Sequence, residues 1–362
     1  MIELEINLEI KTKEIAVKLF VLTTEDEAKI NPEVWYTPES VGRLNIAPFE
    51  VTIKNLEIPI RVKQYPMSQK GRHGLQPVIE RLLQQGLLEP CMSPHNTPIL
   101  PIKKSDGSYR LVQDLREVNK RTVTGFPVVA NPYTLLSHLS LELKWYSVID
   151  LKDAFWACPL KEEWRNYFAF EWEDPETHRK QQLRWTVLPQ GFTESHNLFG
   201  QALEQVLETF ESTPEVTLAQ YVDDLLLAGE DQETVRNESI RLLNFLSLKG
   251  FKVSKSKLQF TEEEVKYLGH WLSKGTKKLD PERVNGILSL QAPTSKRQIR
   301  QLLGLLGHCR QWIENYSNKV KFLYQKLVGV GLIKWTQKDE QSLESLKADL
   351  VNALVLSSPD IK

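Results

Sequence analysis

Apolar residues recur at helical spacing in two central segments of the chain, residues 68–86 and 192–210. Gly86 is well suited to follow a helix directly, and Pro214 lies shortly after the second segment. Three further helix starts mark the C-terminal part, namely Asp280 with Pro281, Thr294 for a helix reaching Trp312, and the capping-box sequence Thr336–Asp339. The pattern predicts two central helices and a mostly helical C-terminal unit.

Strands are indicated at the N-terminus by alternation and near residue 100 by a turn signal. Ile2–Ile6 and Ile15–Val21 alternate apolar and charged positions, which predicts short strands with one solvated face. Residues 101–112 form a candidate hairpin around the two-residue turn Asp106-Gly107. This register would place Lys103 opposite Arg110 on one face, where two cations repel unless an anion lies between them. A polyphosphate is the expected anion, and an exposed cationic hairpin without a ligand is the alternative.

The middle of the chain predicts a sheet that carries acids at its edge. Trp145–Ile149 is typical of a buried strand, and the strand ends at Asp150. Two more apolar runs, Leu218–Val222 and Leu225–Ala228, are separated only by Asp223 and Asp224, which predicts a β-hairpin with acids at its tip. Strand, helix and hairpin in this order favour an α+β fold, with an antiparallel sheet and helices on one face.

The charges are segregated, although the formal net charge of the chain is only −1. Counted along the sequence, residues 61–125 hold 11 basic and 5 acidic residues, and residues 249–310 hold 13 and 5. Residues 141–245 between them hold 9 basic and 20 acidic residues. Two basic blocks around an acidic one favour a nucleic-acid binder with a cation-binding centre, although solvated charged faces are the alternative.

The composition argues against two other classes of protein. No run approaches the roughly eighteen uncharged apolar residues of a membrane helix, and the start of the chain lacks the pattern of a signal peptide. We therefore expect an intracellular protein without a membrane partner. The three cysteines, Cys91, Cys158 and Cys309, are too few and too widely spaced for a disulfide framework or a zinc ribbon.

Asp150, Asp223 and Asp224 are the strongest candidates for chemistry. Phosphoryl transfer by two metal ions needs carboxylates that bridge cations roughly 3.5–4 Å apart. One acid at the end of a strand and two at a hairpin tip can converge if the strands are neighbours. From spacing alone, a polar turn and a helix cap explain the same residues equally well.

The sequence around these acids resembles the reverse transcriptases of retroviruses, and in particular the gammaretroviral branch. Tyr221–Asp224 is similar to the signature of that family. Further similar motifs occur in the order of the family: Gln64–Ser68, Ser93-Pro94, Asn96–Pro98, Val112–Arg121, Asp150–Phe155, Leu188–Phe192 and Tyr267–Gly269. The resemblance covers about residues 59–362. The chance that so many motifs match in the same order by coincidence is very small.

The resemblance implies a right-hand polymerase with fingers, a ferredoxin-like palm and a helical thumb. It places the fingers at residues 61–125, the palm at 126–275 with a fingers insertion at about 160–190, and the thumb at 276–362. Residues 1–60 would be an N-terminal extension, for which a remnant of a protease junction is one interpretation. The connection and ribonuclease H domains of the family would be absent, and no ribonuclease H activity is expected.

The resemblance also assigns roles to residues of the centre. Asp150 and Asp223 would bind two Mg²⁺ ions directly, with Mn²⁺ as a substitute. The backbone carbonyl of Leu151 would help, and Asp224 would be the third acid. Six further residues would bind the incoming nucleotide: Lys103, Arg110, Asp153, Phe155, Gln190 and Tyr221. Among these, Phe155 would crowd the 2′ position of the sugar, although a core phenylalanine is the structural alternative.

Residues farther from the acids would contact the template and the primer. The motif match assigns this role to Arg116, Asn119, Leu268, Gly269, His270 and Trp271. A salt bridge or a cap is the alternative for Arg116 and Asn119. The positions of His270 and Trp271, and those of Trp156 and His196, are usually filled differently in the family. Drift in an endogenous copy would produce such departures.

The sequence thus predicts an RNA-directed DNA polymerase that extends a primer on an RNA or DNA template with dNTPs. It would be monomeric and either cytoplasmic or virion-associated. Two alternatives stay open: a nucleic-acid-binding remnant of an endogenous retroviral element without turnover, and a two-metal nuclease or RNA-dependent RNA polymerase. The intact acids argue against the first alternative, and Phe155 argues against ribonucleotide use.

Overall fold

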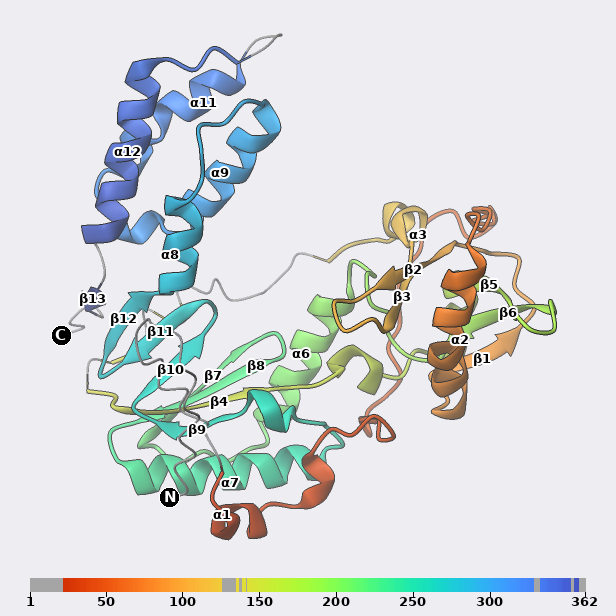
Figure 1. Cartoon of the computed structure of the whole chain (residues 1–362). Coiled ribbons are helices and arrows are strands. Elements are labelled where there is room, and N and C mark those ends of the chain that lie inside the picture. Colours follow the sequence, from red (N-terminus) through yellow and green to blue (C-terminus); the bar gives the residue numbers. More distant parts are fainter. Residues whose placement is uncertain are drawn as a thin grey trace, which may run out of the picture.

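A computed structural model of the chain describes residues 22–125, 135–136, 139–140, 142–328, 333–352 and 355–357 (Figure 1). The expected strands Ile2–Ile6 and Ile15–Val21 lie outside the described residues. The helices are α1 (Thr24–Ala28), α2 (Gln69–Gln84), α3 (Arg116–Arg121), α5 (Glu162–Arg165), α6 (Ser195–Leu207), α7 (Gln232–Leu248), α8 (Pro281–Leu288), α9 (Lys296–His308), α10 (Tyr316–Lys319), α11 (Lys321–Leu327) and α12 (Gln337–Asn352).

Short 3₁₀ turns and thirteen strands complete the described structure. The 3₁₀ turns are η1 (Pro32–Val34), η2 (Ala154–Ala157), η3 (Asn166–Phe168), η4 (Lys255–Lys257) and η5 (Arg310–Trp312). The strands are β1 (Leu88–Cys91), β2 (Ile99–Lys103), β3 (Tyr109–Gln113), β4 (Trp145–Asp150), β5 (Ala169–Glu173), β6 (Lys180–Trp185), β7 (Val216–Tyr221), β8 (Asp224–Gly229), β9 (Gln259–Glu262), β10 (Glu264–Tyr267), β11 (His270–Ser273), β12 (Thr276–Leu279) and β13 (Val355–Ser357).

The predicted palm is an antiparallel sheet in the order β7-β8-β4-β9. Strand β8 is buried along most of its length because both of its faces are covered. Leu225 and Leu227 point into the core that α6 and α7 share, whereas Leu226 packs with Val265 on the opposite face. The helices therefore lie on one face of the sheet, as the sequence predicted, and the sheet β10-β11-β12-β13 flanks the other (Figure 1).

The predicted fingers combine α2 with the three-stranded sheet β1-β6-β5 and the hairpin β2-β3. The register expected for this hairpin is wrong. Lys103 pairs with Tyr109, and Arg110 pairs with Ile102, so Lys103 and Arg110 point to opposite faces. The cause is a longer turn: the Gly107 amide donates to the Lys104 carbonyl, and Gly107 has a φ of 85°. Lys103 and Arg110 therefore do not face each other across the hairpin.

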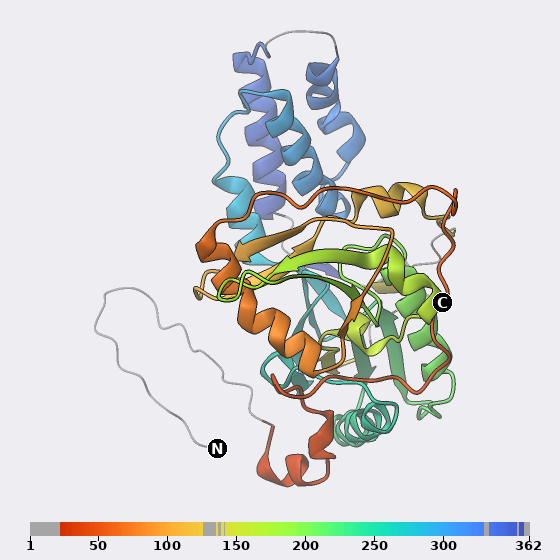
Figure 2. The same ribbon diagram turned by 90° about the vertical axis from the view of Figure 1, so that its right-hand side faces the viewer.

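Residues 22–60, here called the N-terminal strap, share the core of the palm and fingers. Ile30, Val34 and Leu44 are buried in the same cluster as residues of β4 and α7. Figure 2 shows the strap running from α1 along the side of the molecule to the fingers. In the described residues, therefore, this part of the expected N-terminal extension packs into the same core as the palm and fingers.

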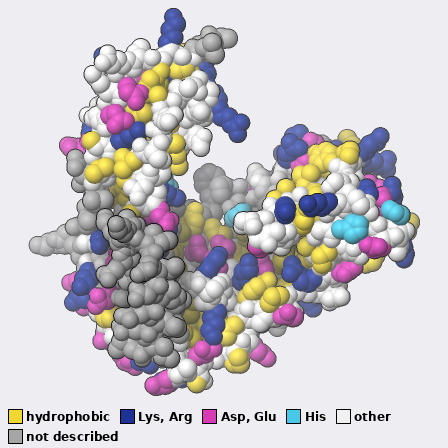
Figure 3. Space-filling view, viewed as in Figure 1, with side chains coloured by type: hydrophobic (Ala, Val, Ile, Leu, Met, Phe, Trp, Pro, Cys, Tyr) yellow, Lys and Arg dark blue, Asp and Glu magenta, His cyan; other side chains and the backbone are white. Residues whose placement is uncertain are grey.

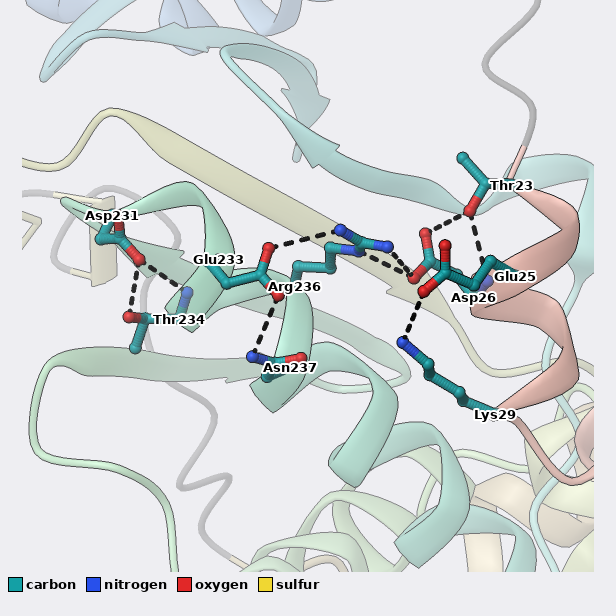
Figure 4. A network of polar contacts seen from close by, with 9 residues as sticks. All are labelled: Thr23, Glu25, Asp26, Lys29, Asp231, Glu233, Thr234, Arg236 and Asn237. Atoms are coloured by element: carbon teal, nitrogen blue, oxygen red, sulfur yellow. Dashed lines mark hydrogen bonds and ion pairs between the residues drawn. The ribbon is translucent and has the colours of Figure 1, made fainter.

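The strap is anchored to the palm by a buried ion pair between α1 and α7. An Asp26 carboxylate oxygen lies 2.6 Å from an Arg236 guanidinium nitrogen, and the Thr23 hydroxyl donates to the other Asp26 oxygen at 2.6 Å (Figure 4). The Asp26 side chain is only 3% exposed. Hence solvent reaches the pair only from the side of Arg236, which is 27% exposed, and the pair fixes the start of the strap.

The C-terminal helices form a second core that is separate from the first, with Leu302, Leu306 and Leu346 among its buried residues. The caps at Asp280 and at Thr336 with Asp339 are confirmed. The helix expected from Thr294 to Trp312 is shorter: α9 ends at His308, and η5 follows. None of the helices in the described ranges is both long and apolar enough to cross a membrane.

Candidate functional site

The three candidate acids come together where strands β4 and β8 pair. Asp150 is the last residue of β4, and it faces Asp224, the first residue of β8, across the ladder. Asp223 lies in the tight turn between β7 and β8, beside Val222 with a φ of 53°. The Leu151 amide donates to the Asp223 carbonyl at 3.0 Å, which ties this turn to the end of β4. Two neighbouring strands thus hold three carboxylates in one place.

The negative charges of these three acids repel one another. Burial, together with the charge of Asp150, raises the pKa of Asp223 above its ordinary value. Burial and the charges of Asp223 and Asp150 raise the pKa of Asp224 to about 6. Partly buried carboxylates that repel one another favour either protons or a nearby cation.

One cation at this site comes from a residue that the sequence reasoning missed. The Lys257 ammonium nitrogen lies 3.1 Å from a carboxylate oxygen of Asp150, and its charge opposes the rise in the pKa of Asp224. Lys257 ends the short turn η4 and is 62% exposed, so it can move away from Asp150. The only signal in the sequence is a lysine-rich stretch far from the acids, at residues 252–257.

The donor set suits a divalent cation in charge and chemistry. Among the described residues, no three His, Cys, Asp or Glu side chains are placed closely enough to hold a metal ion as they stand. However, carboxylate oxygens are the ligands that Mg²⁺ prefers, and Asp150 and Asp224 face each other across the ladder with Asp223 in the adjacent turn. The three acids therefore suit such an ion in their chemistry and charge.

The segment after β4 carries two of the predicted nucleotide-binding residues. Asp153 has a left-handed backbone, with a φ of 50°, and begins the turn η2. Phe155 in this turn is half-buried and packs edge-on against Phe199 at 5.7 Å and against His196 at 4.8 Å between ring centroids. The position of the Phe155 ring is therefore fixed by α6 on one side and by the Asp153 turn on the other.

The loop before α6 is joined to the fingers by two side chains. An Arg110 guanidinium nitrogen donates to the Gln190 side-chain oxygen at 2.5 Å, which brings two predicted nucleotide-binding residues into contact. The Asn119 amide nitrogen donates to the Gly191 carbonyl, and its oxygen accepts from the Thr193 amide, both at 3.0 Å. Asn119, predicted to contact the template, thus clamps this loop. Lys103 is exposed at the hairpin.

Arg116, also predicted to contact the template, is held by Asp114. Two guanidinium nitrogens of Arg116 lie 2.8 and 2.6 Å from the two carboxylate oxygens of Asp114, and the Tyr65 hydroxyl donates to Asp114 at 2.8 Å. These hydrogen bonds hold the pKa of Asp114 well below its ordinary value. Arg116 remains 77% exposed, so the pair orients its cation toward solvent. Tyr65 and Asp114 lie in the motifs Gln64–Ser68 and Val112–Arg121, but the sequence alone predicted no role for them.

The predicted primer-contacting residues divide into two kinds. Leu268 and Gly269, with φ values of 49° and 76°, form the two-residue turn between β10 and β11. Trp271 is half-buried, whereas His270 is fully buried and presents no surface to a primer. The His270 ring instead stacks on Trp312 at 5.0 Å and on His308 at 5.5 Å, both from the C-terminal helical unit.

Comparisons with known proteins place this arrangement in a family. Residues 102–272 match a family model described as reverse transcriptase (RNA-dependent DNA polymerase). Over 332 residues, 91% of the chain, the sequence is 43% identical to the Pol polyprotein of Feline endogenous virus ECE1. The chain belongs to the retroviral reverse transcriptases. The Gag-Pol polyprotein of Gibbon ape leukemia virus is a further relative of this reverse transcriptase, with 42% identity over 91% of the chain.

Solved structures agree with this assignment of the reverse transcriptase fold. The foamy viral protease-reverse transcriptase in complex with dsDNA superimposes with a TM-score of 0.81 at 28% identity, covering 94% of this chain and 71% of that one. The foamy viral enzyme in complex with an RNA/DNA hybrid gives a TM-score of 0.77 at 28% identity, covering 91% and 44%. The present chain spans 32% and 20% of the length of the two polyproteins named above. The predicted α+β right-hand polymerase fold is confirmed.

Proposed function

We propose that this reverse transcriptase extends a primer on an RNA or DNA template by nucleotidyl transfer. The observation that carries the proposal is the convergence of Asp150, Asp223 and Asp224 at the paired ends of β4 and β8. In the reaction, the primer 3′ oxygen forms a bond to the α-phosphorus of a dNTP, and the bond to pyrophosphate breaks. The 3′ hydroxyl passes its proton to solvent water as this bond forms.

Divalent cations, Mg²⁺ or in its place Mn²⁺, are the proposed cofactors. Asp150 and Asp223 would hold them, with the Leu151 carbonyl and Asp224 in support. When bound, these ions would lower the charge of the phosphates and favour the ionised 3′ oxygen. Lys257 compensates part of the charge of Asp150 in the protein alone. Because the Lys257 side chain is exposed, it can move away from Asp150 when divalent cations bind.

The nucleotide would lie between the acids and the fingers hairpin. Arg110, already in contact with Gln190, and the exposed Lys103 supply positive charge for the triphosphate. The half-buried Phe155 and Tyr221 supply the apolar walls beside the sugar. Because Lys103 and Arg110 point to opposite faces of the hairpin, we propose that they contact different phosphates.

The template and primer would occupy the hollow face between the fingers and the C-terminal helices. Figure 3 shows this face with Lys and Arg side chains on both sides of the hollow. Arg116 would contact the template, while the turn Leu268-Gly269 would support the primer together with Trp271. We propose a monomer acting in the cytoplasm or in a virion.

The proposal is tested by extension of a labelled DNA primer on an RNA template with dNTPs and Mg²⁺. We expect extension by the wild-type chain. The extension rate should fall by at least about a thousandfold in Asp223→Asn, because a neutral amide cannot balance the positive charge of the cations. The matched control is Glu230→Gln, which removes an exposed acid just beyond β8 and should leave the rate unchanged.

Template-primer binding measured in the same samples separates the alternatives. Tight binding without extension by the folded wild-type chain would contradict the polymerase and would support a nucleic-acid-binding remnant. Equal extension by wild type and Asp223→Asn would remove the acids from the mechanism.

A further inference from the structure

The N-terminal strap reaches the catalytic acids through a ladder of three backbone segments. The amide of Tyr36 donates to the Val253 carbonyl at 3.0 Å, and the amide of Val253 donates to the Val34 carbonyl at 2.8 Å. On its other side, the segment 252–254 bonds to the end of β4. The Ser254 amide donates to the Asp150 carbonyl at 3.1 Å, and the Lys152 amide donates to the Lys252 carbonyl at 2.8 Å. The strap is thus one segment removed from Asp150.

The side chain of Tyr36 continues this connection to the residues after Asp150. The Lys152 ammonium nitrogen lies 5.3 Å from the centre of the Tyr36 ring, in a cation–π contact. The same nitrogen lies 3.6 Å from a carboxylate oxygen of Asp153. Burial, together with the charge of Asp153, raises the pKa of the Tyr36 hydroxyl. The Tyr36 ring therefore contacts Lys152, and the Lys152 ammonium group in turn contacts Asp153.

That loop sets the direction of Phe155. Asp153 adopts the left-handed conformation, with φ 50° and ψ 38°, which a residue other than glycine adopts only with support from its surroundings. The Asp153 carbonyl then accepts from the Trp156 amide at 2.9 Å, and the Phe155 carbonyl accepts from the Cys158 amide at 3.1 Å. The conformation of Asp153 thus determines where the η2 turn places the Phe155 ring.

We propose that Tyr36 is a positioning residue for the nucleotide-sugar pocket, acting through Lys152 and Asp153 on Phe155. This inference rests on the proposed function. It makes the strap a contributor to sugar selection, a role that the position of Tyr36 in the sequence gives no reason to expect. Tyr36 itself does not touch the acids.

The first test compares Tyr36→Phe, which keeps the ring, with Tyr36→Ala, which removes it. In single-nucleotide extension, we expect the KM for dNTP to rise about two- to tenfold in Tyr36→Phe, because the electrostatic interaction of the hydroxyl with Asp153 is lost. We expect a larger rise in Tyr36→Ala, with kcat within about twofold of wild type in both variants. The preference for dNTP over rNTP should fall in the same order, because a displaced Phe155 ring crowds the 2′ position less.

A matched control separates this role from a general weakening of the strap. Asp26→Asn breaks the anchor between α1 and α7, on the same strap but away from the loop. It should lower the thermal midpoint without changing the KM for dNTP or the sugar preference. If Asp26→Asn changes these values as much as Tyr36→Phe does, or if neither Tyr36 variant changes them, the proposal is wrong.

A measurement on the protein without substrates tests the positioning role of Tyr36 independently of polymerase activity. Hydrogen exchange of the Trp156 and Cys158 amides should accelerate in Tyr36→Phe relative to wild type and to Asp26→Asn. Faster exchange in a chain that does not extend primers would support the positioning role and contradict the proposed function. Unchanged exchange together with unchanged sugar preference in an active chain would overturn the positioning role alone.

Discussion

The Phe155 ring carries the most specific prediction that a single residue allows. The ring is half-buried and packs edge-on against Phe199 and His196, so its orientation is fixed before a nucleotide binds. Phe155→Val should therefore admit ribonucleotides and reduce the preference for dNTP over rNTP by at least about tenfold. Competitive extension with paired dNTP and rNTP measures this ratio. An unchanged ratio would remove Phe155 from sugar selection.

Residues within a local motif could be predicted from the sequence, whereas contacts set by distant segments could not. The convergence of Asp150, Asp223 and Asp224 followed from strand ends and a hairpin tip. The pairing of Lys103 was wrong, because a one-residue difference in the turn at Gly107 reverses which face each side chain occupies. Lys257 was missed because it lies 107 residues from Asp150, its partner.

Among the elements, the strap is held at its start by an ion pair between Asp26 and Arg236. Burial alone would raise the pKa of Asp26, but the hydrogen bonds and charge of Arg236 and the hydroxyl of Thr23 outweigh it and lower the pKa. Replacing Asp26 removes hydrogen bonds between charged groups and leaves Arg236, which is 27% exposed, with its pair to Glu233 at 3.3 Å. Asp26→Asn should therefore lower the free energy of unfolding by about 2 kcal/mol at pH 7, measured by urea denaturation.

The same ion pair predicts a dependence on pH. Because the folded pKa of Asp26 lies below its unfolded value, its stabilisation is present above the unfolded value and is lost as pH falls through the folded one. The difference between wild type and Asp26→Asn should therefore shrink below about pH 4. Glu25→Gln is the control, because its pair with Lys29 at 3.1 Å is exposed and contributes little. A difference that stays constant down to pH 3 would contradict this account.

The helices that were predicted carry local signals, whereas α7 (17 residues) was not predicted. Ser68 caps α2, Asp280 caps α8, and both positions agree with the sequence pattern. The strap carries short helical turns and isolated bridges in place of regular strands, so no periodic pattern marks it between residues 22 and 60. Its structure comes from partners such as Asn244 and Val253, which the sequence of the strap alone does not reveal.

At the scale of the whole molecule, a stack of rings joins the palm to the C-terminal helices. His270 on β11 lies parallel to His308 on α9 and to Trp312 on η5. Burial and the charges of His308, Arg283 and Lys277 lower the pKa of His270 to about 4, and burial and Arg283 lower that of His308. The stack is therefore built from neutral histidines, and a proton on either one opposes it.

This stack predicts that the molecule loses stability in mild acid. A histidine whose folded pKa lies below its unfolded value stabilises the fold above about pH 6.5, and this contribution falls as pH decreases toward 4. The thermal midpoint of wild type should fall between pH 7 and pH 4.5, and the double variant His270→Phe/His308→Phe should fall less. Parallel pH profiles for the two proteins would show that the histidines are not the cause.

The strap also has a consequence for the order in which the molecule can form. Glu27 pairs with Lys255, 228 residues later, and Asn31 bonds to Asn244, 213 residues later. During synthesis, the strap leaves the ribosome long before these partners exist, and closing so long a loop delays folding. The strap therefore cannot pack in its final position before α7 and η4 have been synthesised. Until then, its apolar residues can be bound by chaperones or by neighbouring chains.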